Sequence, residues 1–318
     1  MPPVDPFDSH GNPKEPAVFR QRLLRLGLSP QAWEPLTADA SVRRFFRVYL
    51  RPGKSAVLML YPPEDAVSVR HHAAVFRWAR RQGLPVPKLL AEAAEGLVVE
   101  DLGSRGVREA LAANPDAAQE QLLRVLAAFQ AYRGPFTLNP PFDQDLFMRE
   151  LQQFLDYSGL GQPAAPAVLA FCRSLAFALA AHPYRLCHRD FHLDNLLATP
   201  VGIKAVDFQD LRLGPDTYDV ASLLRERGGT TLFPDDFLAR AAQVLGWEAN
   251  WQTRFTQCAA QRGLKALGTF LKLASLGRSQ YRRLIPEVAT NAWQAVKALG
   301  GPAELLAVLE KLSAAEGL

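Results

Sequence analysis

Cysteine and long apolar runs are scarce in this chain of 318 residues. Its three cysteines, Cys172, Cys187 and Cys258, are widely separated and form no C-x-x-C pair. This spacing argues against a disulfide framework and against a zinc site built from thiolates. The cysteine content is therefore typical of a protein from a reducing compartment.

The sequence also lacks a segment suited to crossing a membrane or to directing secretion. Its most hydrophobic stretch, 168–181, is interrupted by Arg173 and is shorter than the roughly 20 residues that a transmembrane helix needs. Residues 1–16 are rich in proline and have no apolar core, unlike a signal peptide. We therefore expect a cytoplasmic protein without a membrane partner, and a flexible N-terminus over 1–16.

Neither sign of charge is in large excess. The chain has 36 Lys and Arg against 32 Asp and Glu, and apolar residues make up 48%. The arginines are scattered and often stand beside acids, as in 225–227, whereas nucleic-acid-binding domains concentrate basic charge on one face. The composition predicts a packed globular chain and no nucleic-acid partner.

The apolar pattern changes near residue 101. Before it, the sequence predicts a β-rich region with one internal helix: a short helix over 19–26, a hairpin over 45–60, a helix over 65–82 and a strand over 97–100. After it, helical patterns dominate and enclose three short strands: helices over 105–132, 143–158 and 163–181, strands over 184–187, 195–198 and 203–206, and helices beyond 215. We expect an α/β (α+β) fold with a small β-rich N-lobe, 17–103, and a large helical C-lobe, 104–318.

The stretch 186–219, LCHRDFHLDNLLATPVGIKAVDFQDLRLGPDTYD, concentrates polar groups at strand ends. Asp190 and Asn195 fall in a loop between two short strands, and Asp207 follows the next one. Carboxylate and amide oxygens suit Mg²⁺, which binds through a few carboxylates together with substrate phosphates. A remaining aspartate could accept a proton from a hydroxyl nucleophile.

Two histidines in this stretch, His188 and His192, stand four residues apart. On a helix they could bind zinc, but Arg189 occupies the place of the glutamate in an H-E-x-x-H motif and the segment is predicted to be a loop. We interpret His188 as a buried, hydrogen-bonded residue. His192 is either part of the scaffold or a substrate contact.

The segment 188–195 resembles the H-x-D-x-x-x-x-N catalytic loop of protein-kinase-like phosphotransferases, and Asp207-Phe208-Gln209 stands where those enzymes have D-F-G. The second histidine, the D-F-x-D pattern and G-P-x-x-Y-D are similar to the aminoglycoside phosphotransferase and choline kinase branch. This resemblance implies a bilobal protein-kinase-like fold that uses ATP and Mg²⁺. It also implies residue roles: Asp190 as catalytic base, Asn195 and Asp207 as Mg²⁺ ligands, Asp219 as a buried support of the loop, and Asp210, His188 and His192 as scaffold or substrate contacts.

A narrower resemblance links three further segments to the anomeric amino-sugar kinases, which phosphorylate N-acetylmuramate and N-acetylglucosamine in cell-wall recycling. These segments are 39–48 (DASVRRFFRV), 218–225 (YDVASLLR) and 261–270 (QRGLKALGTF). With the central motif they span most of the chain. The resemblance implies phosphorylation of the anomeric hydroxyl of an amino sugar.

Nucleotide contacts are expected in the N-lobe. Backbone N–H groups near Ser41 can bind phosphate, and an arginine guanidinium can bind two phosphate oxygens at once. Arg43 and Arg47 share one face of the predicted strand and Arg44 lies on the other; the alternative for them is a solvated hairpin edge. In a kinase-like fold, residues 101–103 would form the hinge, and backbone groups at Glu100 and Leu102 would face the adenine.

Two departures from the kinase pattern leave alternatives open. The loop 39–46 has no glycine, and the strand 56–61 has no lysine to pair with phosphate; Lys54 stands in the turn before it. A nucleotide-binding pseudokinase that regulates a partner is therefore one alternative. Within the kinase class, an aminoglycoside or choline-like substrate is the main competitor, although a cationic substrate needs an acidic pocket and the C-lobe has few acidic clusters beyond 235–236. We expect a monomer that acts on a small molecule.

Overall fold

The computed structural model describes residues 16–36, 43–62, 64–160 and 165–314. The chain divides into two compact units, Met1–Ser104 and Arg105–Leu318. The predicted flexible segment 1–16 lies outside the described residues except for Pro16, where the first helix begins.

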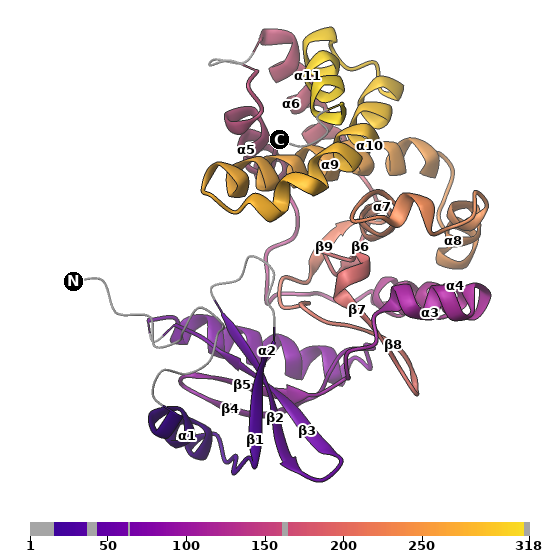
Figure 1. Cartoon of the computed structure of the whole chain (residues 1–318). Helices are drawn as coiled ribbons and strands as arrows, with labels where there is room; N and C mark the ends of the chain where they lie inside the picture. Colours follow the sequence, from indigo (N-terminus) through magenta and orange to yellow (C-terminus); the bar gives the residue numbers. More distant parts are fainter. Residues whose placement is uncertain (1–15, 37–42, 63, 161–164, 315–318) are drawn as a thin grey trace. The chain divides into compact units, whose positions relative to one another are not determined.

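The N-terminal unit is built on one five-stranded antiparallel sheet in the order β1-β2-β3-β5-β4. In Figure 1, helix α2 runs along one side of this sheet and helix α1 lies on the other. The bounds are α1 Pro16–Arg25, β1 Ala32–Leu36, β2 Arg44–Arg51, β3 Lys54–Leu60, α2 Ala66–Arg81, β4 Leu89–Ala93 and β5 Gly96–Glu100.

The hairpin predicted from the sequence is confirmed as the pair β2–β3, with Phe46 opposite Leu58. Gly53 supplies the positive φ of 70° that the tight turn requires. Phe46 faces α1, where its ring lies 4.7 Å from the ring of Phe19. The edge strand β1 was not predicted, because Pro35 interrupts its β-forming residues; an edge strand tolerates the missing N–H.

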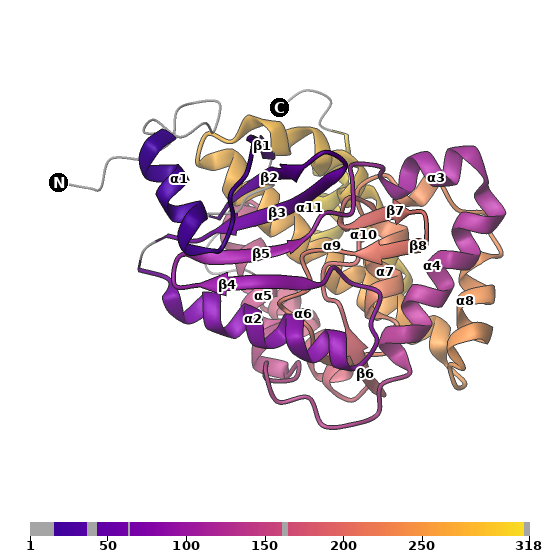
Figure 2. The ribbon, with the colours of Figure 1, turned by 90° about the horizontal axis from the view of Figure 1, so that it is seen from below.

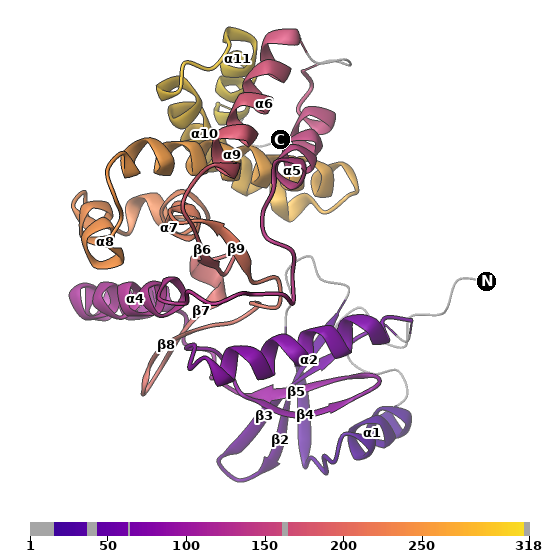
Figure 3. The same ribbon diagram turned by 180° about the vertical axis from the view of Figure 1, so that it is seen from behind.

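The C-terminal unit is largely helical, as Figures 2 and 3 show from two further directions. Its helices are α3 Val107–Ala113, α4 Pro115–Gln130, α5 Gln144–Tyr157, α6 Pro166–Ala180, α7 Tyr218–Arg225, α8 Phe237–Leu245, α9 Trp251–Ser275, α10 Ile285–Ala298 and α11 Ala303–Ser313. The predicted helical segment 105–132 is two helices. Asn114 caps the second by accepting a hydrogen bond from Ala117 N (3.2 Å), and Pro115 occupies its first position.

Two short antiparallel ribbons carry the polar motif. One pairs β6 (Tyr184–Cys187) with β9 (Arg212–Pro215), and the other pairs β7 (Leu196–Thr199) with β8 (Gly202–Ala205). Asp190 therefore lies in the loop between β6 and β7, and Asp207 comes after β8, as predicted. Strand β9 was not predicted, because Gly and Pro fill half of it. Among the described residues no helix is both long and apolar enough to span a membrane.

Candidate active site

The loop after β6 has an unusual backbone conformation that one buried carboxylate holds in place. Arg189 adopts a φ of 81°, a region that costs free energy for a residue with a side chain. The Asp219 carboxylate accepts hydrogen bonds from His188 N (2.6 Å) and Arg189 N (3.0 Å). The His188 ring adds a contact of 2.9 Å between its Nε2 and the carbonyl of Val206. These bonds fix the loop that presents Asp190.

Asp219 is almost fully buried, with 1% of its surface exposed. Burial raises the pKa of its carboxyl above the usual range, although the His188 ring and the two N–H groups favour the charged form. Asp219 comes from the first turn of α7, so this helix anchors the loop. Its carboxylate binds the backbone N–H groups of the loop.

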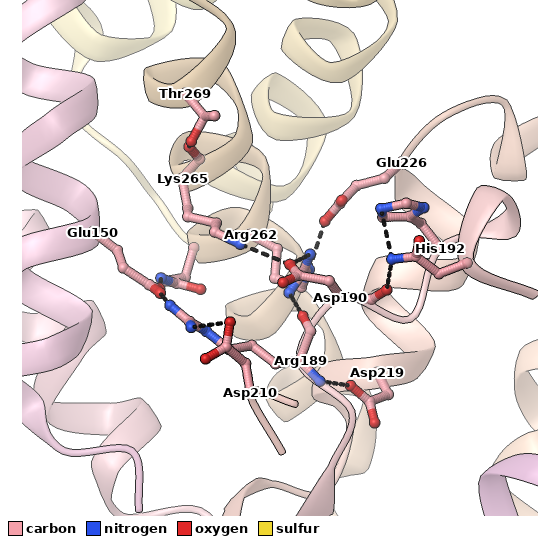
Figure 4. Close-up of polar contacts among 12 residues, drawn as sticks. Glu150, Arg189, Asp190, His192, Asp210, Asp219, Glu226, Arg262, Lys265 and Thr269 are labelled. Atoms are coloured by element: carbon pink, nitrogen blue, oxygen red, sulfur yellow. Dashed lines mark hydrogen bonds and ion pairs between the residues drawn. The ribbon is translucent and has the colours of Figure 1, made fainter. Parts of the chain in front are cut away.

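The Asp190 carboxylate faces two cations from α9. Its Oδ1 lies 2.9 Å from Lys265 Nζ and 3.6 Å from Arg262 Nη2 (Figure 4). Burial alone would raise the pKa of Asp190, but the charges of Lys265, Arg262 and Arg189 outweigh it and hold the pKa well below its usual range. The side chain is 30% exposed, so Asp190 is an ionised carboxylate that a ligand can reach.

Arg262 connects this loop to the segment after α7. Only 1% of its side chain is exposed, and its Nε lies 2.5 Å from Glu226 Oε1. Its Nη1 donates to the carbonyl of Arg189, and its guanidinium lies 4.7 Å from the centre of the Tyr218 ring. Arg262 is thus a structural cation whose hydrogen-bond donors are committed to the protein.

A second ion-pair group holds the side chain of Arg189. Its Nη2 donates to Glu150 Oε1 at 2.8 Å, and Glu150 Oε2 accepts from Gln261 Nε2 at 2.7 Å. Asp210, which is half exposed, lies 3.5 Å from Arg189 Nη1. Charges of both signs therefore alternate around Asp190 and tie α5, α9 and the loop together.

The predicted metal ligands Asn195 and Asp207 offer an amide oxygen and a carboxylate, which are oxygen ligands that fit Mg²⁺. Asn195 Nδ2 donates to the carbonyl of Asp190 (2.9 Å) and lies 3.3 Å from His192 Nε2. These contacts involve the amide nitrogen and not the Oδ1 that would bind a metal ion. Asp207 has a φ of 58° and accepts from Gln209 Nε2 at 2.6 Å. Within the part of the chain that is described, no cluster of three or more His, Cys, Asp or Glu forms a metal site. One carboxylate and one amide, completed by substrate phosphates, is the kind of set that Mg²⁺ accepts.

His192 is neutral at physiological pH. Burial and the charge of Arg227 lower the pKa of His192 to about 4. A neutral imidazole can accept the hydrogen bond from Asn195, so the contact orients the amide. The contact with Asn195 is consistent with a scaffold role for His192, one of the two roles that the sequence left open.

Three residues of this site, Lys265, Arg262 and Glu150, received no role from the sequence. The first two lie in the segment 261–270, which the sequence singles out only by its similarity to the amino-sugar kinases. The two glycines of this segment mark places where α9 packs too closely for a side chain. A Cβ at Gly268 would come within 2.6 Å of Phe154 N, and one at Gly263 within 2.8 Å of the Ala292 Cβ. These glycines let α9 approach α5 and α10 closely, which places its cations beside the loop.

The residues predicted to contact the nucleotide lie in or just before strand β2 of the N-terminal unit, apart from Ser41, Glu100 and Leu102. Ser41 lies outside the described residues. Arg44 opens β2, and Arg43 precedes the strand with its guanidinium 5.6 Å from the Phe45 ring centre. Arg47 binds carboxylates: its Nε lies 2.7 Å from Asp101 Oδ2 and its Nη1 lies 3.0 Å from Glu34 Oε1.

Asp101 anchors the segment that follows β5. Besides Arg47, it accepts hydrogen bonds from Ser55 Oγ (2.6 Å) and Gly103 N (2.9 Å). Burial raises the pKa of Asp101, but these hydrogen bonds outweigh it and the pKa lies below its usual value. The backbone of Glu100 pairs with Lys88, since Glu100 N donates to the Lys88 carbonyl at 2.8 Å. Leu102, which follows Asp101, is half buried.

A five-stranded antiparallel sheet followed by a largely helical unit is the arrangement of a kinase-like fold. Comparison with known proteins agrees. A solved structure of an amicoumacin kinase, in complex with AMP-PNP, Ca²⁺ and Ami, matches with a TM-score of 0.65 at 16% identity, over 94% of this chain and 92% of that one. A family model of phosphotransferase enzymes matches residues 32–254, well over half of the chain. The protein therefore belongs to the phosphotransferase enzyme family.

Among curated relatives, the chain is 30% identical over 307 residues to an N-acetylmuramate/N-acetylglucosamine kinase from Neisseria meningitidis. The match covers 88% of this chain and 90% of the relative. A protein of the same name from Pseudomonas aeruginosa is 29% identical over 287 residues, 79% of this chain and 80% of the relative. The fold prediction and the predicted family resemblance are confirmed.

Proposed function

We propose that this phosphotransferase moves the γ-phosphoryl group of ATP to the anomeric hydroxyl of an N-acetylated amino sugar. The observation that carries the acceptor class is the similarity to amino-sugar kinases over 79–88% of the chain in two relatives. ATP as donor is supported by the solved kinase with bound AMP-PNP that shares the fold. The two-lobe division at 103/104, with nucleotide binding in the N-lobe, is part of this proposal.

Asp190 is the proposed base. Its carboxylate is ionised and 30% exposed, and Lys265 and Arg262 fix its position, whereas Asp194 on the same loop pairs with Arg108 and Arg227. Its low pKa makes it a weak base, which suits this reaction for two reasons. Phosphoryl transfer has a loose transition state that depends on position and charge more than on base strength. An anomeric hydroxyl is also more acidic than an ordinary alcohol.

Asn195 and Asp207 are the proposed Mg²⁺ ligands. When bound, the ion would neutralise phosphate charge and orient the transferring group. The chain's own contribution is orientation: the hydrogen bonds from Asn195 Nδ2 and from Gln209 Nε2 hold the amide and the carboxylate in place.

Removal of either ligand should make turnover depend on much higher Mg²⁺ concentrations. We expect Asp207→Ala to lose more activity than Asn195→Ala, because it removes a charged ligand and not only a dipole. Titration of Mg²⁺ against both turnover and ATP affinity measures this, with EDTA and Mg²⁺ re-addition as the control. Wild-type activity that persists in EDTA would contradict the metal assignment.

An acceptor screen tests the proposed function. The purified chain is incubated with ATP and free sugars, amino sugars, aminoglycosides or choline, and ATP consumption is followed. We expect turnover with N-acetylglucosamine or N-acetylmuramate and little with the cationic acceptors. Turnover confined to an aminoglycoside or choline would favour the other kinase class, and ATP binding without turnover on any acceptor would favour a pseudokinase.

A further inference from the structure

The ammonium of Lys265 pairs with the carboxylate of Asp190, the residue proposed to accept the proton. An ammonium 2.9 Å from a carboxylate stabilises the charged form and weakens it as a base. A weak base suffices for the proposed reaction, and a neutral hydrogen-bond donor would position it equally well. The cation therefore calls for a function of its own.

Lys265 and Arg262 stand three residues apart on α9, and both face Asp190. They differ in how their donors are used. Arg262 is buried and gives its guanidinium to Glu226 and to the Arg189 carbonyl. The Lys265 ammonium has Asp190 as its one hydrogen-bond acceptor among the described residues, and 19% of its side chain is exposed. An ammonium has three N–H groups, so two remain for a ligand.

The nearby carboxylate of Glu150 does not take up these donors. Its Oε1 accepts from Arg189 and its Oε2 accepts from Gln261. Arg189 is itself engaged by Glu150 and, at 3.5 Å, by Asp210. Arg189 and Lys265 are similarly exposed, at 18% and 19% of their side chains. Both terminal nitrogens of Arg189 are engaged by carboxylates and its Nε is buried, so Lys265 is the cation around Asp190 with donors left for a ligand.

The proposed reaction creates a negative charge that the free N–H groups of Lys265 can bind. The acceptor hydroxyl oxygen forms a bond to the γ-phosphorus, and the bond from that phosphorus to the bridging oxygen breaks, so ADP leaves with the electron pair. The hydroxyl proton passes to Asp190, which becomes a neutral acid. Lys265 then faces no anion on Asp190, while a doubly charged phosphate has formed on the adjacent oxygen.

The Lys265 ammonium would have to move only a short distance from Asp190 to the new phosphate. A hydroxyl that gives its proton to Asp190 must lie within about 2.6–3.2 Å of that carboxylate. Lys265 Nζ lies 2.9 Å from the same carboxylate. The attacked hydroxyl and the ammonium are therefore neighbours around one group, and the four-carbon stem of lysine is flexible enough to follow the charge.

We propose that Lys265 is a further catalytic residue, whose ammonium pairs with Asp190 before the reaction and binds the transferred phosphoryl group as Asp190 takes up the proton. This inference rests on the proposed function, because it needs a hydroxyl acceptor at Asp190.

The test compares Lys265→Met, Lys265→Arg and the control Lys272→Met, which removes a lysine two turns further along the same helix. Single-turnover rates are measured with N-acetylglucosamine, which is neutral, and N-acetylmuramate, which carries a carboxylate. We expect Lys265→Met to lose about 10²–10³-fold in rate with both sugars, the usual cost of removing one charge-stabilising donor. Lys265→Arg should recover part of this loss, and Lys272→Met should behave as wild type.

A binding measurement without turnover separates catalysis from loop support. Calorimetry of each variant with N-acetylglucosamine and with its 1-phosphate should show that Lys265→Met weakens binding of the phosphate and leaves that of the free sugar unchanged. Equal phosphate affinity and a wild-type rate would overturn the proposal, and so would a loss confined to the carboxylate-bearing sugar. A wild-type chain that phosphorylates neither sugar would instead overturn the proposed function, and this inference with it.

Discussion

Asp190→Asn is expected to lower kcat by about 10²–10⁴-fold, the range for loss of a general base. Asparagine keeps the shape and the hydrogen-bonding ability of the side chain but cannot accept the hydroxyl proton. ATP affinity should change little, because the variant leaves Asn195 and Asp207 intact. Steady-state kinetics together with nucleotide binding measure the two effects separately.

The control for this variant is Asp194→Asn, which neutralises a carboxylate on the same loop whose side chain is 47% exposed and which binds Arg108 and Arg227. It should retain most of the activity. Because the pKa of Asp190 lies well below its usual range, the wild-type rate should stay level on the acid side until below the pH at which an ordinary aspartate protonates. A wild-type turnover rate in Asp190→Asn would make Asp190 structural and return the pseudokinase to consideration.

Arg262→Met is expected to reduce the free energy of unfolding by about 3–5 kcal/mol, the cost of removing one partner from a buried ion pair. The substitution leaves Glu226, whose side chain is 6% exposed, without its cation. It also removes the donor that holds the Arg189 carbonyl of the strained loop. Urea denaturation of wild type and variant measures the loss.

The double variant Arg262→Met, Glu226→Gln is the informative control. With both charges gone, no unpaired charge remains buried, so much of the lost stability should return. If the two single substitutions simply add in the double variant, the pair is not coupled and Arg262 stabilises the loop through its other contacts, the Arg189 carbonyl and the Tyr218 ring.

Much of the fold could be predicted because local patterns agreed with tertiary packing. The hairpin β2–β3 combines alternating buried residues with a glycine turn, and the loop between β6 and β7 follows from its flanking strands. Where local signals conflicted, prediction failed. Pro35 concealed β1, and Asn114-Pro115 divided what the apolar spacing suggested was one helix.

The candidate site could be predicted only where its residues are close in the sequence. Asp190, Asn195, Asp207 and Asp219 fall within thirty residues, so their spacing was informative. Lys265 and Glu150 reach the same place from α9 and α5, 75 positions after and 40 before Asp190, and only packing brings them there. Arg47 is predicted as a phosphate contact from its strand position. Its ion pair with Asp101 involves a residue 54 positions away, which local spacing does not reveal.

The position of the new phosphate on the sugar shows which hydroxyl the enzyme activates. The chain is incubated with ATP, Mg²⁺ and N-acetylglucosamine, and the product is analysed by ³¹P–¹H correlation NMR. We expect a phosphate coupled to the anomeric proton, formed by wild type and nearly absent with Asp190→Asn. A phosphate on the primary hydroxyl, or the same anomeric product formed at an undiminished rate by Asp190→Asn, would contradict this expectation.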